Sequence, residues 1–182
     1  MYNKKRNPLL LILLLSFFTS QHLAADAASQ IDAKVDVAIK KFKEQVKGGA
    51  AFLPKVKGYL VFPSIIKAGF IVGGKYGKGA LRVNGKTKYY YSLASASVGL
   101  QAGAQEQAML IAFLSDASLQ NFIKSNGWEA GVDGSIAISD WGHSKDISSI
   151  SFEKPIVAFI FDEKGIMASV SIAGTKFQKI IP

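Results

Sequence analysis

The sequence of 182 residues contains no cysteine and only two histidines. Without cysteine, we expect neither a disulfide bond nor the cysteine-linked lipid anchor of some exported proteins. A zinc site needs several cysteine or histidine ligands, so zinc is not expected either. Beyond the N-terminal segment, no stretch comes near the ~18 uninterrupted apolar residues that suggest a membrane-spanning helix.

Catalysis by histidine is not favoured, because we expect the first 27 residues, which include His22, to be removed. The remaining histidine, His143, lies in a polar loop with Asp140, Ser144 and Asp146. A hydrolase in which His143 activates a serine is one alternative, but the motif G-x-S-x-G is absent. The acidic residues do not have EF-hand spacing. We therefore expect no enzyme, no metal and no other cofactor.

The first 27 residues resemble a secretory signal peptide. Basic residues at 4–6 precede an apolar run at 9–18 and a small-x-small site at 25–27, which is the order that such peptides show. We expect cleavage after Ala27 and one domain over residues 28–182, since 49% hydrophobic residues are enough for a packed core. The protein is then exported, periplasmic or secreted, and peripherally attached to a membrane.

Positive charge is concentrated in the first half of the chain. Between Lys34 and Lys88, thirteen lysines or arginines stand against two acidic residues, whereas from Tyr89 to Pro182 there are six against nine. This asymmetry favours an anionic partner, either lipid headgroups or nucleic acid. Lysine predominates, with Arg82 the only arginine after the signal segment, and lysine favours point-charge attraction over bidentate recognition. We expect an anionic phospholipid membrane and no nucleic acid; nucleic acid or another polyanion is the alternative.

An amphipathic helix is predicted over residues 30–47, with Ser29 as its N-cap and Gly48-Gly49 as its end. The other positions include Lys34, Lys40, Lys41, Lys43, Glu44 and Lys47. The apolar face is expected to dock on the core, and the lysines beside Phe42 also suit a membrane interface; the sequence leaves both roles open, and the two are compatible. The apolar positions are Ile31, Val35, Ala38, Ile39, Phe42 and Val46.

The rest of the chain favours short strands bounded by glycine or proline, such as "GYLVFP", "AGFIVGG" and "GALRV". Asn84-Gly85 predicts a hairpin turn, and Ser115 predicts the cap of a short central helix that ends near Gly127. "EQAMLIAFL" fits a strand or a helix. "AGVDGSIAI", "PIVAFIFD" and "IMASVSIAG" predict three further strands, the last two joined at residues 162–165, and residues 139–151 a polar loop.

Residues 69–76 read G-F-I-V-G-G-K-Y, close to the nucleotide-binding pattern G-x-x-x-x-G-K-[ST]. A phosphate loop needs small residues at the start of a helix and a hydroxyl for magnesium. Here Phe70, Ile71 and Val72 favour extended structure, and Tyr76 replaces the hydroxyl residue. We therefore expect no nucleotide, and predict instead a β-hairpin with Lys75 and Lys78 at its tip.

Four blocks carry a family resemblance: "YLVFPSIIKAGFIVGGKYGKGAL", "ASASVGLQAGAQEQAMLIAF", "WEAGVDGSIAI" and "FEKPIVAFIFDEKGIMASVSIAGT". In order and spacing they resemble the SYLF domain family of lipid-binding proteins. The resemblance implies binding of acidic lipids, partly through a basic N-terminal helix, here with Lys34, Lys40, Lys41, Lys43 and Lys47. For a bacterial exported member it implies phosphatidylglycerol or cardiolipin rather than phosphoinositides. The protein-interaction modules of endocytic members are lacking, so actin-related roles are not carried over.

Residue pattern and resemblance together predict an α+β fold: an antiparallel, β-rich, barrel-like sheet with an N-terminal amphipathic helix and one short central helix. The function expected is peripheral binding of anionic phospholipid membranes through a lysine-rich face and the helix. The candidate lipid-binding residues are, in chain order, Lys34, Lys40, Lys41, Phe42, Lys43, Lys47, Lys55, Lys57, Lys67, Lys75, Lys78 and Arg82.

Overall fold

The computed structural model describes residues 8–69, 72–98, 104–125, 127–139, 146–149, 153–164 and 172–182. The elements that precede the central helix are α1 (Pro8–Gln45), α2 (Gly49–Phe52), η1 (Leu53–Lys55), β1 (Gly58–Gly69), β2 (Val72–Val83), β3 (Lys86–Val98) and β4 (Ala104–Phe113). The central helix and the elements after it are α3 (Asp116–Lys124), β5 (Trp128–Glu129), β6 (Ala137–Ser139), η2 (Ile147–Ser149), β7 (Ile156–Lys164) and β8 (Lys176–Ile180).

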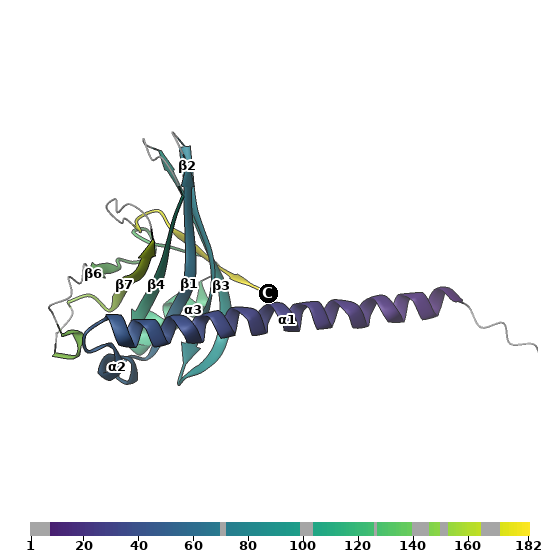
Figure 1. Ribbon diagram of the computed structural model, residues 1–182, viewed down its shortest axis with the longest axis horizontal. Helices are drawn as coiled ribbons and strands as arrows, with labels where there is room; N and C mark the ends of the chain where they lie inside the picture. Colours follow the sequence, from purple (N-terminus) through teal and green to yellow (C-terminus); the bar gives the residue numbers. More distant parts are fainter. Residues whose placement is uncertain are drawn as a thin grey trace, which may run out of the picture.

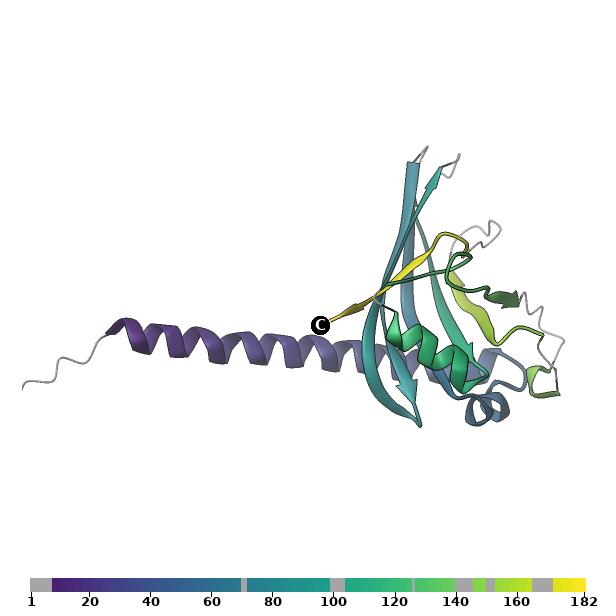
Figure 2. The ribbon, with the colours of Figure 1, turned by 180° about the vertical axis from the view of Figure 1, so that it is seen from behind.

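The predicted α+β fold is confirmed: the strands form a curled half-barrel sheet. Within the described residues its order is β5-β8-β3-β2-β1-β4-β7-β6. The sheet is mixed rather than purely antiparallel, because β6 pairs with β7 in parallel. Figure 1 shows α1 crossing the lower part of the sheet, and Figure 2, from behind, shows α3 on the opposite face.

The sheet has a hydrophobic core on each face because successive residues of a strand point to opposite sides. On the face covered by α3, called here the α3 face, Leu60 and Phe62 pack with Phe122 of the helix. On the face covered by α1, called the α1 face, Val61 packs with Val35. Strands β1 to β4 are therefore buried from both sides at their lower ends.

Helix α1 runs without a break through Ser29, so the predicted N-cap at Ser29 is wrong for the full-length chain. The helix ends at Gln45, and Gly48 then adopts a positive φ of 83°, as the glycine pair predicts. Cleavage after Ala27 stays a prediction. Among the described residues, no helix combines the length and the hydropathy that crossing a membrane would require.

Strand β1 is longer than predicted because it continues past Pro63. Its register with β2 shifts between Val61 and Ile65, and a proline without an N–H group is tolerated at such a bulge. At this point the backbones approach closely: a Cβ on Gly79 would lie 2.1 Å from the carbonyl oxygen of Val61. The glycines of β2 thus serve close strand packing.

The hairpin turn at Asn84-Gly85 and the helix cap at Ser115 were both predicted correctly from the residue types at these positions. Asn84 and Gly85 both have positive φ between β2 and β3, and the Ser115 side chain accepts a hydrogen bond from the Ser118 N–H at the start of α3. "EQAMLIAFL" contributes to strand β4. The predicted strand "AGVDGSIAI" is wrong for its first half, where residues 131–133 form a turn. Most of "IMASVSIAG" lies outside the described residues, and the prediction lacked β8.

Candidate functional site

The apolar face of α1 is fully used by the fold. Phe42 has 0% exposure, and its ring packs edge-on against Phe159 and Phe161 at centroid distances of 5.4 and 5.5 Å. Phe42 therefore does not lie on the surface, which corrects its place among the candidate lipid contacts. Of the two roles left open for this face, the structure shows docking on the sheet.

A polar cluster fastens the same helix to β2 and β3. The Arg82 guanidinium donates to Asp36 at 2.7 Å and lies 3.3 Å from Asp32, while Thr87 and the Tyr90 hydroxyl donate to Asp32 at 2.6 and 2.8 Å. Burial and then the hydrogen bond to Asp32 raise the pKa of Tyr90 to about 12. Arg82 is only 8% exposed, so it anchors the helix instead of facing a partner.

Sequence analysis missed this cluster because charged residues on a helix are most often solvated. Two signals could have found it. Arg82 is the only arginine after residue 27, and Asp32 and Asp36 are acidic positions on a helix otherwise dominated by lysine.

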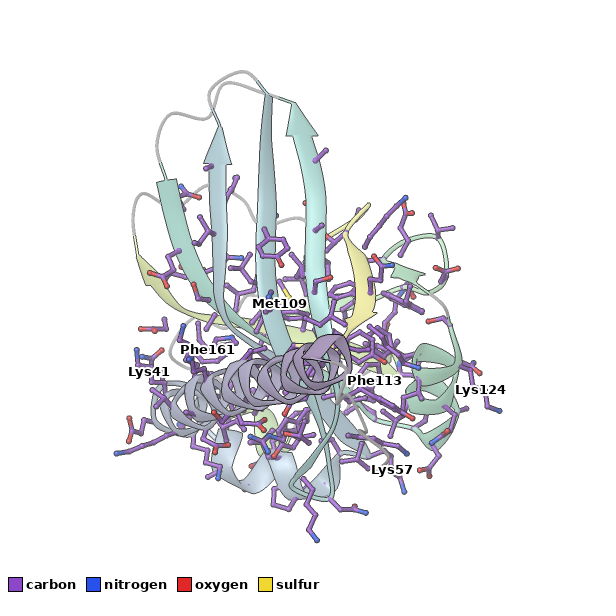
Figure 3. All side chains as sticks on the ribbon, turned by 90° about the vertical axis from the view of Figure 1, so that its right-hand side faces the viewer. Lys41, Lys57, Met109, Phe113, Lys124 and Phe161 are labelled. Atoms are coloured by element: carbon purple, nitrogen blue, oxygen red, sulfur yellow. The ribbon has the colours of Figure 1, made fainter. Side chains whose placement is uncertain are left out.

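Lys41 and Lys34 lie away from the other helix lysines. The Lys41 ammonium forms a 2.6 Å ion pair with Asp162 of β7, and Figure 3, which looks along α1, shows Lys41 and Lys57 on opposite flanks of the helix. Lys34 is exposed and lies seven residues before Lys41. Seven residues are about two helical turns, so Lys34 lies on the same flank of α1 as Lys41.

The remaining helix lysines share one side. Lys40, Lys43 and Lys47 are exposed, and their spacing of three and four residues forms a stripe along α1 that points away from the sheet. The hairpin of β2 and β3 and helix α2 lie below this part of α1 (Figure 1). We call the lower end of the molecule, where these elements meet, the basal face. We define it by its exposed lysines from α1, the segment before β1, and the start of β3: Lys40, Lys43, Lys47, Lys55, Lys57 and Lys86.

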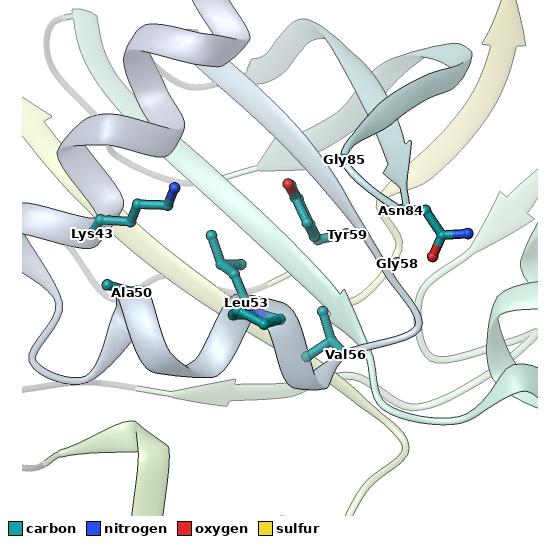
Figure 4. A pocket seen from close by; sticks show the side chains of 9 residues that line it. Lys43, Ala50, Leu53, Val56, Gly58, Tyr59, Asn84 and Gly85 are labelled. Atoms are coloured by element: carbon teal, nitrogen blue, oxygen red, sulfur yellow. The ribbon is translucent and has the colours of Figure 1, made fainter.

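An open pocket of about 270 Å³ lies in the basal face. Its apolar wall comes from α2, η1 and the residues before β1, and its rim from Lys43 and the Asn84-Gly85 turn. Figure 4 shows Lys43 extending from α1 in the direction of Tyr59, with Leu53 beside them. Burial raises the pKa of Tyr59, which keeps its hydroxyl neutral under ordinary conditions.

Acidic groups offset part of the basal charge. Lys57 lies 3.1 Å from Asp116 and Lys40 lies 3.9 Å from Glu44, both in exposed pairs. Hydrogen bonds from Ser148 lower the pKa of Asp146, with smaller contributions from Lys47 and Lys55. Such exposed pairs are weak and screened by salt, so the lysines remain able to meet an anionic surface.

The structure divides the predicted lysines instead of gathering them on one side. Lys75 and Lys78 lie within β2, several residues from the hairpin end, which corrects their placement at its tip. Lys75 pairs across the strands with Lys67, and strand alternation places both on the α3 face, whereas Lys78 is on the α1 face. These three lysines are separate from the basal face.

Three other kinds of site were considered from the sequence: a nucleotide loop, a catalytic histidine and a metal site. Described residues of the G-x-x-x-x-G-K span lie in strands β1 and β2 instead of a loop that leads into a helix. His143 lies outside the described residues. In the described part of the chain, no three carboxylate or histidine side chains gather so that they could hold a metal ion.

Comparison with known proteins identifies a family. Residues 94–179 match Ysc84, described as Las17-binding protein actin regulator, which confirms the resemblance to the SYLF domain family. That family is associated with lipid binding and with actin-related binding. No curated protein matches the chain. The matched residues begin within β3 and contain none of the basal lysines.

Proposed function

We propose that this chain, which carries the Ysc84 (SYLF) domain at residues 94–179, binds anionic phospholipid membranes through its basal face and catalyses no reaction. The observation that supports this most directly is an open, apolar-walled pocket that is lined by Lys43 and formed by chain segments that carry further exposed lysines. Such a surface suits headgroups that carry negative charge. The proposed place of action is the periplasm or the exterior of the cell, in line with the predicted signal peptide.

Attachment is peripheral and electrostatic in this proposal, because the apolar face of α1 is engaged with the sheet. Each lysine near an anionic leaflet is worth about 1 kcal/mol. The three α1 lysines of the basal face then account for about 3 kcal/mol, or roughly a hundredfold in affinity. This attraction falls with ionic strength, since the Debye length shortens.

In this proposal the pocket adds apolar contacts and a hydrogen-bond donor to the positive charge of the basal face. Lys43 stands at its rim beside the apolar side chains of Leu53 and Val56. In the proposal, the ammonium pairs with a lipid phosphate and the apolar wall contacts the glycerol backbone next to it. Tyr59, held neutral, is available as a hydrogen-bond donor in the same pocket.

The experiment is sedimentation of the protein with vesicles of phosphatidylcholine alone and of phosphatidylcholine mixed with phosphatidylglycerol. We expect binding to the mixed vesicles only, weakened by added salt. The triple variant Lys40→Gln, Lys43→Gln, Lys47→Gln is expected to lose roughly a hundredfold in affinity. Equal retention on neutral and anionic vesicles would contradict the electrostatic mechanism.

The matched control removes three exposed lysines elsewhere: Lys124→Gln, Lys154→Gln and Lys176→Gln carry the same change in net charge. If this control loses as much affinity as the basal variant, net charge rather than the basal face determines the affinity for the vesicles.

A parallel titration with DNA tests the alternative partner. Tighter binding to DNA than to phosphatidylglycerol vesicles at physiological salt would favour a nucleic-acid binder.

A further inference from the structure

Lys43 differs from three other lysines of the basal face in having no partner of its own. Lys40 and Lys57 form ion pairs, and Lys55 donates to the carbonyl oxygen of Ser148 at 3.0 Å. In the part of the chain that the structure describes, Lys43 forms neither an ion pair nor a hydrogen bond. Its ammonium group is therefore available to a ligand in the pocket of the basal face, called here the basal pocket, which Lys43 lines.

Tyr59 supplies a second donor to the same pocket. Its side chain is half-buried, and among the described residues its hydroxyl has no hydrogen-bond partner. Figure 4 shows the Lys43 side chain extending toward Tyr59, with Leu53 beside them. Polar groups that the fold buries usually have a partner. The Tyr59 hydroxyl and the Lys43 ammonium together therefore suit a ligand that presents acceptor oxygens.

No carboxylate lines the pocket in the described part of the chain. Asp36 is close enough to affect the pKa of Tyr59, but its carboxylate accepts from the Arg82 guanidinium at 2.7 Å. A positive group in the pocket would meet the Lys43 ammonium and an apolar wall without a carboxylate to offset its charge, and burying an unpaired charge is costly. Apart from Lys43 and Tyr59, the lining residues are apolar or neutral: Ala50, Leu53, Pro54, Val56, Gly58, Asn84 and Gly85.

Anionic phospholipids differ in the group that would lie beside Tyr59. All of them present a phosphate that can pair with Lys43. A headgroup with hydroxyl groups offers oxygen atoms that accept from the Tyr59 hydroxyl, whereas an ammonium group has no acceptor atom and repels the Lys43 ammonium. In phosphatidylserine the carboxylate does not remove this cost, because it is bonded to the carbon atom that carries the ammonium group.

We propose that Tyr59 and Lys43 make the basal pocket selective for a phospholipid headgroup that carries hydroxyl groups and no ammonium group. Lys43 binds the phosphate, and Tyr59 determines the preference because it donates to a headgroup hydroxyl. The inference rests on the proposed function, since it concerns which anionic lipid the basal face binds. The other basal lysines add an attraction that depends on surface charge alone.

The test compares sedimentation of the protein with two kinds of vesicle at equal surface charge and equal ionic strength: phosphatidylcholine mixed with phosphatidylglycerol, and phosphatidylcholine mixed with phosphatidylserine. We expect the affinity for the phosphatidylglycerol vesicles to be about threefold to tenfold higher, the range that one hydrogen bond supplies. Tyr59→Phe removes the hydroxyl and keeps the ring and the net charge, so it should bind both vesicles equally and retain the salt dependence. Tyr76→Phe, at the 52% exposed position in β2, should keep the preference.

A pair of lysine variants separates selectivity from charge. Lys43→Gln and Lys47→Gln remove the same charge from neighbouring turns of α1, but of the two only Lys43 lines the pocket. Each variant should bind the anionic vesicles roughly fivefold more weakly. Lys47→Gln should keep the ratio of the two affinities, whereas Lys43→Gln should bring that ratio close to one.

Equal affinity of the original protein for both anionic vesicles, or a preference for phosphatidylserine, overturns the inference; if vesicles of phosphatidylcholine alone still fail to retain the protein, the proposed function stands. Binding to all three kinds of vesicle alike contradicts both. A preference that Tyr59→Phe keeps also overturns the inference, because it then arises outside the pocket. Urea unfolding of Tyr59→Phe should match that of the original protein. A clear loss of stability would give the hydroxyl a structural role and overturn its role in selectivity.

Discussion

The two ends of the central strands β1 to β4 differ sharply although they belong to the same strands. At the lower end Leu60 and Phe62 have 0% exposure and both faces of the sheet are covered. Toward the upper end Ile66 and Tyr76 are more than half exposed, and lysine, glycine, alanine and serine replace the large apolar residues. The lower end therefore maintains the fold, whereas the upper end presents smaller and more polar side chains.

The largest effect on the free energy of unfolding is expected from removing a buried side chain at the lower end. Phe42→Ala removes a fully buried ring that packs against Phe159 and Phe161, so we expect a loss of about 3–5 kcal/mol in the free energy of unfolding. Tyr76→Ala at the 52% exposed position is expected to change it by less than about 0.5 kcal/mol. Urea unfolding measures both. Similar losses in the two variants would abolish the distinction between the ends.

Two glycines of β2 test the same distinction within one strand. A Cβ on Gly79 meets the carbonyl oxygen of Val61 at 2.1 Å, whereas a Cβ on Gly74 first meets the Ser95 carbonyl oxygen at 3.3 Å. We expect Gly79→Ala to cost about 1–3 kcal/mol through overpacking. Gly74→Ala should be close to neutral, because alanine also restricts the unfolded chain. Equal thermal midpoints for the two variants would contradict the close approach at the bulge.

These differences explain which parts of the structure the sequence could predict. Asn84-Gly85 acts through its own backbone, and the Ser115 side chain accepts from an N–H group three residues later, so the turn and the cap were recognisable from the local sequence. The bulge after Pro63 was not, since it depends on how two strands meet. β8 was missed because "KFQKI" has one buried apolar residue, Phe177, whose partner Leu93 is distant in sequence.

The sequence predicted which type of residue forms the candidate site, but it did not predict where those residues lie in the fold. Charge asymmetry pointed to the lysines, but it could not separate Lys43, at the rim of the basal pocket, from Lys75, on the other side of the sheet. Phe42 and Arg82 were assigned to the surface since a helix face and a lone arginine suit a membrane and a packed core equally. Only tertiary contacts distinguish the two.

A smaller effect is expected from the hydrogen bond that ties β3 to α1. Tyr90→Phe removes the donor to Asp32 and should cost about 0.5–1.5 kcal/mol at neutral pH. The pKa of Tyr90 is raised to about 12 in the folded protein, so this contribution is complete below pH 10, the ordinary pKa, and is lost as the pH rises toward 12. The stability difference between variant and original protein should therefore shrink over that range.

Urea unfolding at several pH values between 9 and 12 measures the difference. Tyr76→Phe is the control, because Tyr76 is 52% exposed toward the upper end of the strands, and this variant should show no such change. A difference for Tyr90→Phe that stays constant across this range would contradict the role of the Asp32 hydrogen bond.

The smallest effect on stability is expected at Lys75, toward the upper end of β2. Its folded-state pKa is lowered by burial and by Lys67, so the charged form is penalised at neutral pH and the folded state gains stability as the pH rises toward the unfolded value. Lys75→Met should therefore unfold at the same or a higher urea concentration at pH 7, by at most about 1 kcal/mol, and should lack the gain at high pH. A clear loss of stability instead would make Lys75 a structural residue of the upper end.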